Sequence, residues 1–380
     1  MYADKWIEID VAAVENNLAQ VQTLLEHKTR LIAVIKANAY GHGAVETARI
    51  LVRNGVDFLA VSFYAEAMQL RQAGIQTEIL VFSPLISPEE ARESVRHQLT
   101  LTIAGDDDCE LLAQASAALS CQLKVHLKID TGLGRFGLTE DMAVQVGQKI
   151  DRHQQLCLAG IYTHAADPSS PAYTAGQFKQ FKQVIGRLEQ EGIVIPLQHM
   201  ANSAVLLRSP EMYLSAVRIG TLLAGQHPVG NFPIRLQLQD PYKFKGRITS
   251  LRTLEKGSYL GYYRSFKLRR TAQIAVLPVG FNDGLALEVG NPPASWRDML
   301  RKLAKICLGY FNWPRFNLKV RIQDRSCLIR GKVFMQMALV EIPPGLKVKV
   351  GDEVELPVRK TVASASITRI YIEAEHHYEG

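Results

Sequence analysis

The stretch LIAVIKANAYGHGA, residues 31–44, runs from a strand-like apolar segment into a turn of small, polar and glycine residues. Lys36 closes the apolar segment, and Tyr40 follows it within the turn. The next segment, AVETARILVRNG (44–55), has apolar residues at three- and four-residue spacing, which is typical of an amphipathic helix. We therefore expect a buried strand, a turn that presents a lysine, and a helix.

This strand pattern recurs through the first part of the chain. The eight strand candidates are LIAVIK (31–36), DFLAVS (57–62), EILVF (78–82), LTLTI (99–103), LKVHLKID (123–130), LCLAGIYTH (156–164), PLQHMAN (196–202) and SAVRIG (215–220). Helix-like stretches lie between most of them, including 106–119 and 174–192, for which Asp106 and Thr174 are the expected N-caps. Gly55 and Gly192 are the expected C-terminal stops.

Eight strands that alternate with helices predict a (β/α)8 barrel of the TIM type. An open, doubly wound sheet is the alternative fold. Such a sheet usually carries a GxGxxG loop, and we expect none in this chain. We therefore expect the barrel.

The second part of the chain has a different pattern and a different charge. Residues 1–235 contain 20 Lys and Arg against 24 Asp and Glu, whereas residues 236–380 contain 24 against 13. The segments after residue 235 alternate as strands and turns, with little helical pattern. We expect a barrel domain over 1–235 and a β-rich domain over 236–380. The basic excess could indicate nucleic-acid binding, but no nucleic-acid motif accompanies it, so we do not expect such a partner.

One helix is expected inside the β-rich domain, at SWRDMLRKLAKICLGYF (295–311). One face carries Trp296, Met299, Leu300, Leu303 and Cys307, and the other is largely basic. Two interpretations remain open. The helix packs on its own domain, or it contacts a partner or a membrane surface.

The composition excludes several classes of protein. Hydrophobic residues make up 47% of the 380, as in a globular protein, and no run approaches the roughly 18 apolar residues of a membrane helix. The first residues do not have the pattern of a secretory signal. The five scattered cysteines have no CxxC spacing, so neither a disulfide framework nor a metal site is indicated. We expect a cytoplasmic protein without a membrane partner.

The expected strands deliver polar side chains to one end of the barrel, where the active sites of this fold lie. The residues at or after the strand ends are Lys36, Tyr40, Lys128, Asp130, Arg135, His164, His199, Asn202, Ser203, Arg218, Gly220 and Thr221. Together they predict a cationic pocket that binds an anion, with hydroxyl and backbone N–H groups suited to a phosphate. A phosphate-bearing cofactor beside a lysine suggests pyridoxal 5'-phosphate (PLP), an aldehyde that lysine amines bind covalently.

Six motifs then identify a family. They are AVIKANAYGHGA (33–44), LKIDTGLGRFG (127–137), GIYTHAAD (160–167), HMANSA (199–204), VRIGTLLAG (217–225) and LPVGFNDG (277–284). In order and spacing, this set resembles the alanine racemases. The resemblance extends from about Trp6 to Arg330 and is weaker beyond.

The resemblance implies a PLP-binding barrel, a β-rich second domain and a homodimer whose subunits share active sites. Lys36 resembles the lysine that holds PLP and acts as one of two bases. Tyr262, in GSYLGYY (257–263), resembles the second base, which the other subunit supplies; it is favoured over Tyr259 and Tyr263. The cofactor-binding residues that the resemblance implies are Lys36, Tyr40, His164, Asn202, Ser203, Arg218, Gly220 and Thr221.

Three further residues resemble the groups that handle the substrate. Arg135 and the backbone N–H of Met335 resemble the donors to its carboxylate, and Lys128 resembles a lysine that some members carbamylate to brace the arginine. The implied function is the interconversion of L- and D-alanine by two bases, Lys36 and Tyr262. An arginine cannot give up its proton, so Arg218 would leave the pyridine nitrogen unprotonated and disfavour side reactions.

The chain also departs from the family pattern, mainly in the second domain. Phe281 stands where the family usually has a tyrosine, Tyr263 where it has a glycine, and Gln336 where it has an aspartate. The tyrosine-bearing segment usual near the end of the chain is not evident before 366–371. These differences leave three alternatives open: a racemase of a larger or basic amino acid, another PLP enzyme of this fold, and a PLP-binding protein without catalysis.

Overall fold

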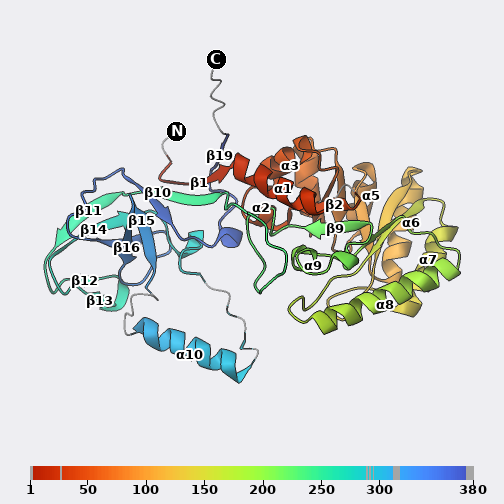
Figure 1. Cartoon of the computed structure of the whole chain (residues 1–380). Helices are drawn as coiled ribbons and strands as arrows, with labels where there is room; N and C mark the ends of the chain where they lie inside the picture. Colours follow the sequence, from red (N-terminus) through yellow and green to blue (C-terminus); the bar gives the residue numbers. More distant parts are fainter. Residues whose placement is uncertain are drawn as a thin grey trace, which may run out of the picture. The chain divides into compact units, whose positions relative to one another are not determined.

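The computed structural model describes residues 3–25, 28–287, 290, 292–293, 295–310 and 317–373. These residues form two compact units (Figure 1). The barrel unit spans Val11–Pro241, and the sheet unit combines the residues up to Asp10 with Tyr242–Glu373. The first strand of the chain thus belongs with the second part of the chain, although its place in the sequence grouped it with the first.

The barrel unit contains a closed barrel of eight parallel strands, as predicted. The strands are β2 (Arg30–Val34), β3 (Phe58–Val61), β4 (Glu78–Val81), β5 (Thr100–Ile103), β6 (Leu123–Lys128), β7 (Leu156–Tyr162), β8 (Leu197–His199) and β9 (Ala216–Ile219). Pairing of β2 with β9 closes the barrel. Strand residues such as Ile32, Phe58 and Leu80 are fully buried, which explains the near-continuous apolar runs in the sequence.

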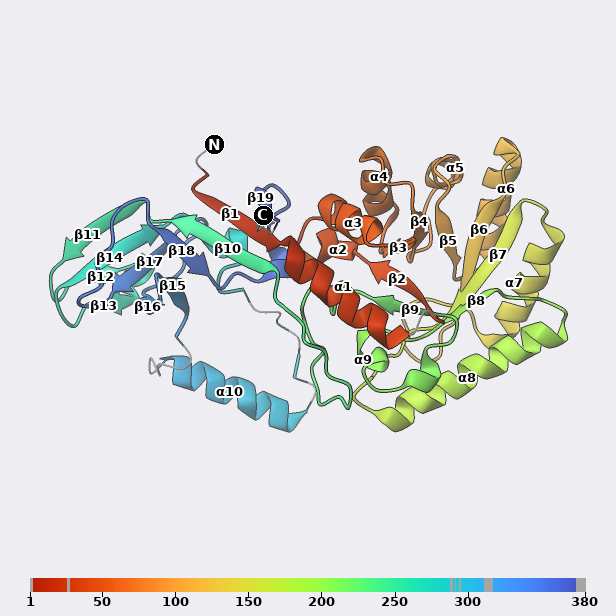
Figure 2. The same cartoon turned by 45° about the horizontal axis from the view of Figure 1, so that its top comes forward.

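Helices surround the barrel between its strands (Figure 2). They are α1 (Val11–Leu25), α3 (Ala44–Arg53), α4 (Tyr64–Gln72), α5 (Pro88–Arg96), α6 (Asp106–Leu119), α7 (Glu140–Arg152), α8 (Pro171–Gln190) and α9 (Ser203–Leu206). Two short turns accompany them, the left-handed α2 (Lys36–Tyr40) and the 3-10 turn η1 (Pro210–Met212). The predicted stops are confirmed, since Gly55 and Gly192 follow α3 and α8 with φ of 87° and 79°.

The two predicted N-caps are wrong. Gly105 is the N-cap residue of α6, so Asp106 lies inside the first turn. The side chain of Asp108 accepts hydrogen bonds from the N–H groups of Gly105 and Ala104. Helix α8 begins at Pro171 after the N-cap Ser170, because proline is favoured at the first helical position.

The sheet unit is mostly β, as predicted, and contains a nine-stranded sheet. In sheet order the strands are β11 (Ser250–Leu254), β14 (Ala272–Leu277), β17 (Ala338–Ile342), β16 (Arg325–Ile329), β15 (Lys319–Ile322), β18 (Glu353–Leu356), β10 (Tyr242–Arg247), β1 (Lys5–Asp10) and β19 (Arg369–Ile372). A two-stranded sheet, β12 (Tyr259–Leu260) with β13 (Phe266–Lys267), and the 3-10 turns η2 (Tyr262–Arg264), η3 (Phe281–Asp283) and η4 (Lys360–Val362) complete the unit.

Helix α10 (Trp296–Tyr310) is the predicted helix within this unit. The apolar side chains of its predicted face are not buried: Trp296 is 64% exposed, Leu300 50% and Ile306 68%. The interpretation of a helix packed on its own domain is therefore wrong for these residues. Phe311, the last residue of the predicted helix, lies outside the described residues.

Within the described part of the chain, no helix combines the length and the apolar character needed to cross a membrane.

Candidate active site

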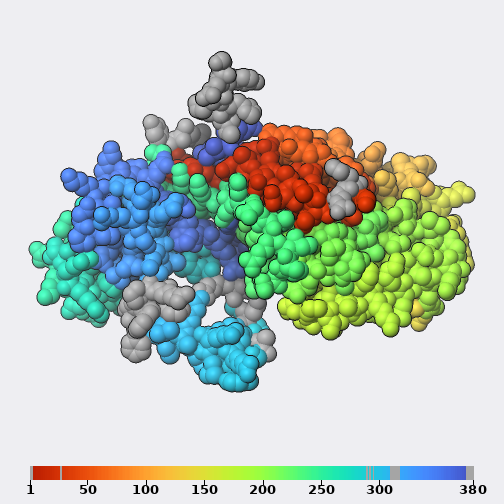
Figure 3. All heavy atoms as spheres, in the orientation of Figure 1, coloured from red at the N-terminus to blue at the C-terminus, as the bar shows by residue number. Residues whose placement is uncertain are grey.

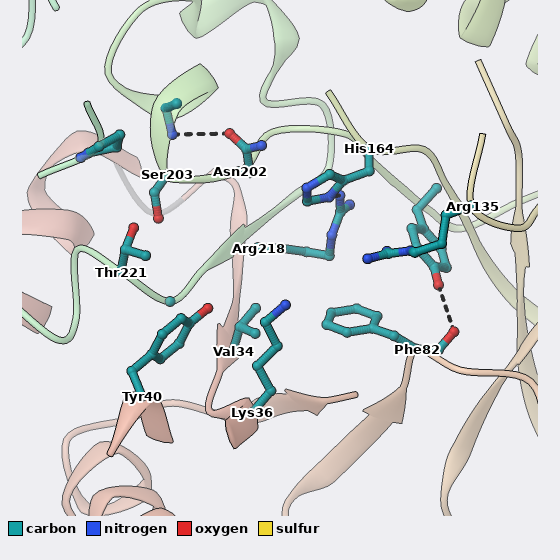
Figure 4. A pocket seen from close by; sticks show the side chains of 14 residues that line it. Val34, Lys36, Tyr40, Phe82, Arg135, His164, Asn202, Ser203, Arg218 and Thr221 are labelled. Atoms are coloured by element: carbon teal, nitrogen blue, oxygen red, sulfur yellow. Dashed lines mark hydrogen bonds between the residues drawn. The ribbon is translucent and has the colours of Figure 1, made fainter. Parts of the chain in front are cut away.

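A cavity of about 330 Å³ opens at the carboxyl ends of the barrel strands (Figure 4). Val34, Phe82 and Tyr162, at or just after the ends of β2, β4 and β7, form part of its wall. Nine residues predicted from the sequence also line it: Lys36, Tyr40, Arg135, His164, Asn202, Ser203, Arg218, Gly220 and Thr221. The structure therefore brings most of the predicted barrel residues together in one cavity of ligand-binding size.

Lys36 stands at the start of an unusual backbone segment. The next four residues, 37–40, all adopt left-handed φ angles, between 50° and 55°. None of them is glycine, and this conformation costs an L-residue about 1–2 kcal/mol. Such a run persists only where its surroundings hold it, and here it places Lys36 and Tyr40 on the same cavity (Figure 4).

The carboxylate of Glu66, in the first turn of α4, holds the start of this left-handed turn. It accepts hydrogen bonds from the N–H of Ala37 at 2.6 Å, of Ser62 at 2.8 Å and of Phe63 at 3.1 Å. One side chain thus ties the residue after Lys36 to the N-terminus of α4, so the helix and the lysine are positioned together.

The polar residues of the quoted stretch hold the end of the turn. The Asn38 side chain accepts the N–H of Ala44, the first residue of α3, at 2.7 Å. The ring nitrogen Nδ1 of the buried His42 lies 2.9 Å from the carbonyl oxygen of Ala39. Gly41 and Gly43 have φ of 94° and 96°, which suits glycine where the chain leaves the turn.

The Lys36 amine is half-buried in cationic surroundings. Burial lowers its pKa from the ordinary value, the charge of Arg135 lowers it further, and Glu66 opposes the shift. A lower pKa increases the share of the neutral amine, which is the form that attacks a carbonyl carbon and accepts a proton.

Arg218, on β9, is the centre of a buried hydrogen-bond network. The guanidinium donates to Nδ1 of His199 at 2.8 Å, to Nδ1 of His164 at 3.2 Å, and to the carbonyl oxygens of His199, Thr163 and Met200. Arg218 is only 4% exposed. Burial is the main cause that lowers its pKa to about 10, so the side chain is still a cation at neutral pH.

The network fixes the tautomers of three histidines, because a guanidinium can only donate. His164 and His199 accept at Nδ1, so each carries its hydrogen on Nε2. Nε2 of His199 lies 2.9 Å from Nδ1 of His126, which therefore accepts, and the His126 hydrogen is also on Nε2. Burial is the largest cause that lowers the pKa of all three histidines, and that of His126 falls to about 3. All three are neutral at physiological pH.

Tyr162 and Lys128 lie next to this network. The Tyr162 ring stacks on His199 with centroids 5.0 Å apart, and Arg218 Cζ and Lys128 Nζ lie 5.0 Å and 5.6 Å from the ring centre. Lys128 is 1% exposed and donates to the carbonyl oxygen of Ile129 at 2.5 Å. Burial, with the charge of Arg218 second, lowers its pKa from 10.5 to about 7.

Arg135 reaches the cavity from a loop that closes on the carboxylate of Asp130. This carboxylate accepts the N–H groups of Gly132, Leu133 and Gly134. The expectation that the chain contains no GxGxxG loop is wrong, because GLGRFG (132–137) has this spacing. The loop follows β6, however, and its glycines form this turn. A Cβ on Gly137 would meet the Asp130 nitrogen at 2.7 Å.

The hydroxyl groups of Tyr40, Ser203 and Thr221 face a common space at one side of the cavity (Figure 4). Gly220 leaves room for this arrangement, since a Cβ there would lie 2.2 Å from the Tyr40 hydroxyl. Asn202 accepts the N–H groups of Ala204 and Val205 at 3.0 and 3.1 Å, which orients the turn carrying Ser203. Three hydroxyls beside a glycine, with cations nearby, fit a phosphate group.

The predicted residues of the sheet unit form a separate cluster. The ring centroids of Tyr262 and Phe334 lie 5.1 Å apart. The N–H of Phe281 donates to the carbonyl oxygen of Phe334, and the N–H of Asn282 donates to that of Met335, each at 3.0 Å. Tyr262 is 65% exposed, Met335 62% and Phe281 42%. The cluster is therefore a surface of the sheet unit.

Sequence reasoning missed several residues that build the site. Glu66, Tyr162 and His126 were not singled out, because each lies inside a helix or strand pattern and has no motif of its own. The signal in the case of Tyr162 was its position two residues before His164, since alternate residues of a strand share a face.

Comparison with known proteins places the chain in a family. The alanine racemase N-terminal domain matches residues 9–228, and the alanine racemase C-terminal domain matches residues 242–375. The chain belongs to the alanine racemase family. Alanine racemase 1 of Oceanobacillus iheyensis is 36% identical over 345 residues, which cover 90% of this chain and 85% of that protein.

Solved structures agree with this membership. An alanine racemase of Clostridium difficile 630 superposes with a TM-score of 0.87 at 28% identity, covering 98% of this chain and 97% of that one. A histidine racemase from Leuconostoc mesenteroides superposes with a TM-score of 0.81 at 22% identity, covering 98% of each chain. At that identity the second likeness shows the shared fold alone.

Proposed function

We propose that this chain is a PLP-dependent alanine racemase that interconverts L- and D-alanine. The observation that carries the proposal is the cavity itself. It joins a half-buried lysine of lowered pKa, a buried arginine cation and a three-hydroxyl cradle at one end of the barrel. Membership of the family and 36% identity to an alanine racemase support alanine as the substrate.

The residues present fit PLP. Tyr40, Ser203, Gly220 and Thr221 would hold the phosphate, and a Cβ at Gly220 would fill the space that the cradle needs. The Lys36 amine would bind the aldehyde carbon. When bound, PLP supplies an electron-withdrawing ring that acidifies the α-carbon of an amino acid attached through its amine.

Arg218 would donate a hydrogen bond to the pyridine nitrogen. Five acceptors hold the guanidinium, and it stays protonated at neutral pH. It therefore offers an N–H without releasing the proton, and the three neutral histidines hold its orientation.

Inversion at a carbon needs proton-transferring groups on two opposite faces. Lys36, as the neutral amine, would take or return the proton on one face. Tyr262 of the partner subunit would serve the other face, in a homodimer with shared active sites. The exposure of the Tyr262 ring supports this assignment, because a group that acts in another subunit's site must be accessible.

Substrate orientation would depend on Arg135 and on the backbone N–H of Met335, each donating to the carboxylate. We also propose that Lys128 is carbamylated. An amine with a pKa of about 7 is substantially neutral at physiological pH, and only the neutral amine adds to carbon dioxide. The addition forms an N–C bond and releases one proton, and the resulting carbamate anion would offset the cationic charge around Arg135 and Arg218.

The test is a panel of enantiopure amino acids incubated with the purified protein and PLP, followed by chiral chromatography and mass analysis of the products. We expect either enantiomer of alanine to be converted into an equal mixture of L- and D-alanine. We also expect this conversion to be faster than that of serine, lysine or histidine. Preferred turnover of a larger or basic amino acid would replace alanine as the substrate. A decarboxylated or deaminated product would replace racemisation as the reaction.

A further inference from the structure

Helix α10 presents an apolar surface that the sheet unit does not cover. On a helix with about 100° per residue, Ile306, Met299, Leu303, Trp296, Cys307 and Leu300 fall within an arc of about 120°. The five largest of these side chains are between 45% and 68% exposed. Figure 3 shows α10, in light blue, with its side chains at the surface.

The amphipathic helix α8 shows what an ordinary surface helix does with such an arc. Its apolar side chains Phe181, Val184, Ile185 and Leu188 are all no more than 1% exposed, and its lysines face solvent. The apolar arc of α10 has no comparable cover among the described residues. Exposed apolar side chains gathered on one face mark a contact surface.

The charges on α10 indicate what covers it. The helix carries four basic residues and one acidic residue. On the same helical projection Arg297 lies beyond one edge of the apolar arc and Lys302 beyond the other, whereas Arg301 and Lys305 lie opposite its centre. Basic side chains at both edges of an apolar arc containing tryptophan and leucine are typical of a helix that lies in the surface of an anionic membrane.

A dimer formed through α10 alone fits this surface less well. A helix of 15 residues is roughly 22 Å long, so one face offers far less than the roughly 800 Å² per partner that a stable protein interface buries. Two copies of α10 pairing through their apolar arcs would also bring the bordering cations together. A bilayer imposes neither limit, because it accepts a short helix and supplies the opposite charge.

We propose that α10 is a membrane-surface helix that buries Trp296, Leu300 and Leu303 among the lipids of an anionic bilayer. Its basic side chains lie at the phosphate headgroups, and the helix axis lies parallel to the membrane. The contact is peripheral and is independent of the proposed racemase function.

The experiment is sedimentation of the full chain, loaded with PLP, with vesicles of phosphatidylglycerol and phosphatidylcholine in a molar ratio of about one to two. The proposal expects co-sedimentation that weakens as salt rises from about 0.05 to 0.5 M. It expects no co-sedimentation with vesicles of phosphatidylcholine alone.

Two pairs of variants separate the apolar and the basic contributions. Leu300→Gln with Leu303→Gln should weaken binding at least about tenfold, whereas Leu300→Met with Leu303→Met should leave it unchanged. Arg297→Gln with Lys302→Gln should weaken it roughly 25-fold, because each cation near an anionic surface contributes about a fivefold gain. Lys179→Gln with Lys182→Gln, which removes the same charge from α8, should have little effect.

Amino-acid turnover of every variant checks that the fold is intact. Equal loss from the α8 and α10 charge pairs would overturn the proposal in favour of general electrostatic adsorption. Absence of binding to anionic vesicles by the folded wild type would overturn it outright. It would also be overturned if the Gln variants changed only the oligomeric state, since a second copy would then be the occupant.

Discussion

Most candidate residues of the barrel unit are buried or half-buried, whereas those of the sheet unit are exposed. In the barrel unit, Arg218 is 4% exposed and donates to five acceptors, and the Lys36 turn is tied to Glu66 and Asn38. In the sheet unit, Tyr262 and Met335 are more than 60% exposed. A single chain therefore pre-organises the cofactor side of the proposed site by itself, whereas the proposed second base, Tyr262, lies on an exposed surface.

This difference follows from how each unit is built. Parallel barrel strands all end at one rim, so residues distant in sequence meet there in a fixed arrangement. In the sheet unit, the 3-10 turn η2 instead exposes Tyr262 and Tyr263, and η3 exposes Phe281. We therefore expect substitutions in the barrel to act within one chain, and substitutions near Tyr262 to depend on a partner chain.

The largest effect is expected from Lys36→Ala. This change removes the proposed covalent anchor for PLP and one of the two proposed bases, so turnover of alanine should fall by at least about 10⁴-fold in both directions. Chiral chromatography gives the rate, and absorbance spectroscopy reports the loss of covalently bound PLP. Lys179→Ala, an exposed lysine on α8, is the control. A rate that falls less than tenfold would show that Lys36 is not the catalytic lysine.

Tyr262→Phe is expected to act next most strongly. It removes one phenolic hydroxyl and leaves the ring contact with Phe334, so alanine turnover should fall by about 10²- to 10⁴-fold while PLP remains bound. Tyr263→Phe, in the neighbouring and 87% exposed tyrosine, is the matched control and should have little effect. Reversed effects of the two changes would assign the second base to Tyr263.

Mixing the two inactive variants tests whether the barrel unit of one chain and the sheet unit of another form one active site together. In a dimer of one Lys36→Ala chain and one Tyr262→Phe chain, a shared site would pair an intact Lys36 with an intact Tyr262. Some activity should return after subunit exchange. Confirmed exchange without any rescue would contradict the shared site.

The barrel half of the site could be predicted from the sequence because strand periodicity fixes where strands end. Once 123–130 and 215–220 were identified as strands, Lys128 and Arg218 had to lie in the barrel. The left-handed turn after Lys36 could not be predicted in this way. Its residues carry no glycine until Gly41, and Glu66, which holds it, belongs to a different helix pattern.

The sheet unit was less predictable for a related reason. Alternation of apolar residues identified its strands, but it could not show that β1 from the chain start pairs with β10 and β19, since that pairing joins distant segments. Periodicity also identified α10 as amphipathic without showing whether its apolar arc is covered. What packs against a face is a property of the tertiary structure.

Lys128 gives a pH-dependent prediction within the barrel. Its folded pKa of about 7 lies below the ordinary value of 10.5, so between these values the unfolded chain binds a proton that the folded chain releases. The free energy of unfolding should therefore rise with pH through this window and level off below about pH 7. Relative to Lys128→Met, the wild type should gain about 3 kcal/mol between pH 7 and pH 10.

Denaturant unfolding in bicarbonate-free buffer measures this difference, and Lys124→Met, at an exposed position of the same strand, controls for the loss of a lysine. Parallel pH profiles for the wild type and Lys128→Met would refute a lowered pKa at Lys128. Addition of labelled bicarbonate to the wild type should then give a carbamate signal that is absent from Lys128→Met.

The smallest effect is expected from Glu66→Gln, which tests how the barrel holds its left-handed turn. The amide keeps one acceptor but turns an NH₂ group toward backbone N–H donors, so unfolding should become easier by about 1–3 kcal/mol. Asp108→Asn is the matched control, because Asp108 occupies the same helical position in α6 and accepts hydrogen bonds from two backbone N–H groups there.

Both changes should lower the free energy of unfolding. Only Glu66→Gln should also weaken PLP binding and slow turnover, since only Glu66 accepts a hydrogen bond from the residue next to Lys36. Equal effects of the two on PLP binding would mean that Glu66 serves helix α4 alone and that the turn holds its conformation without it.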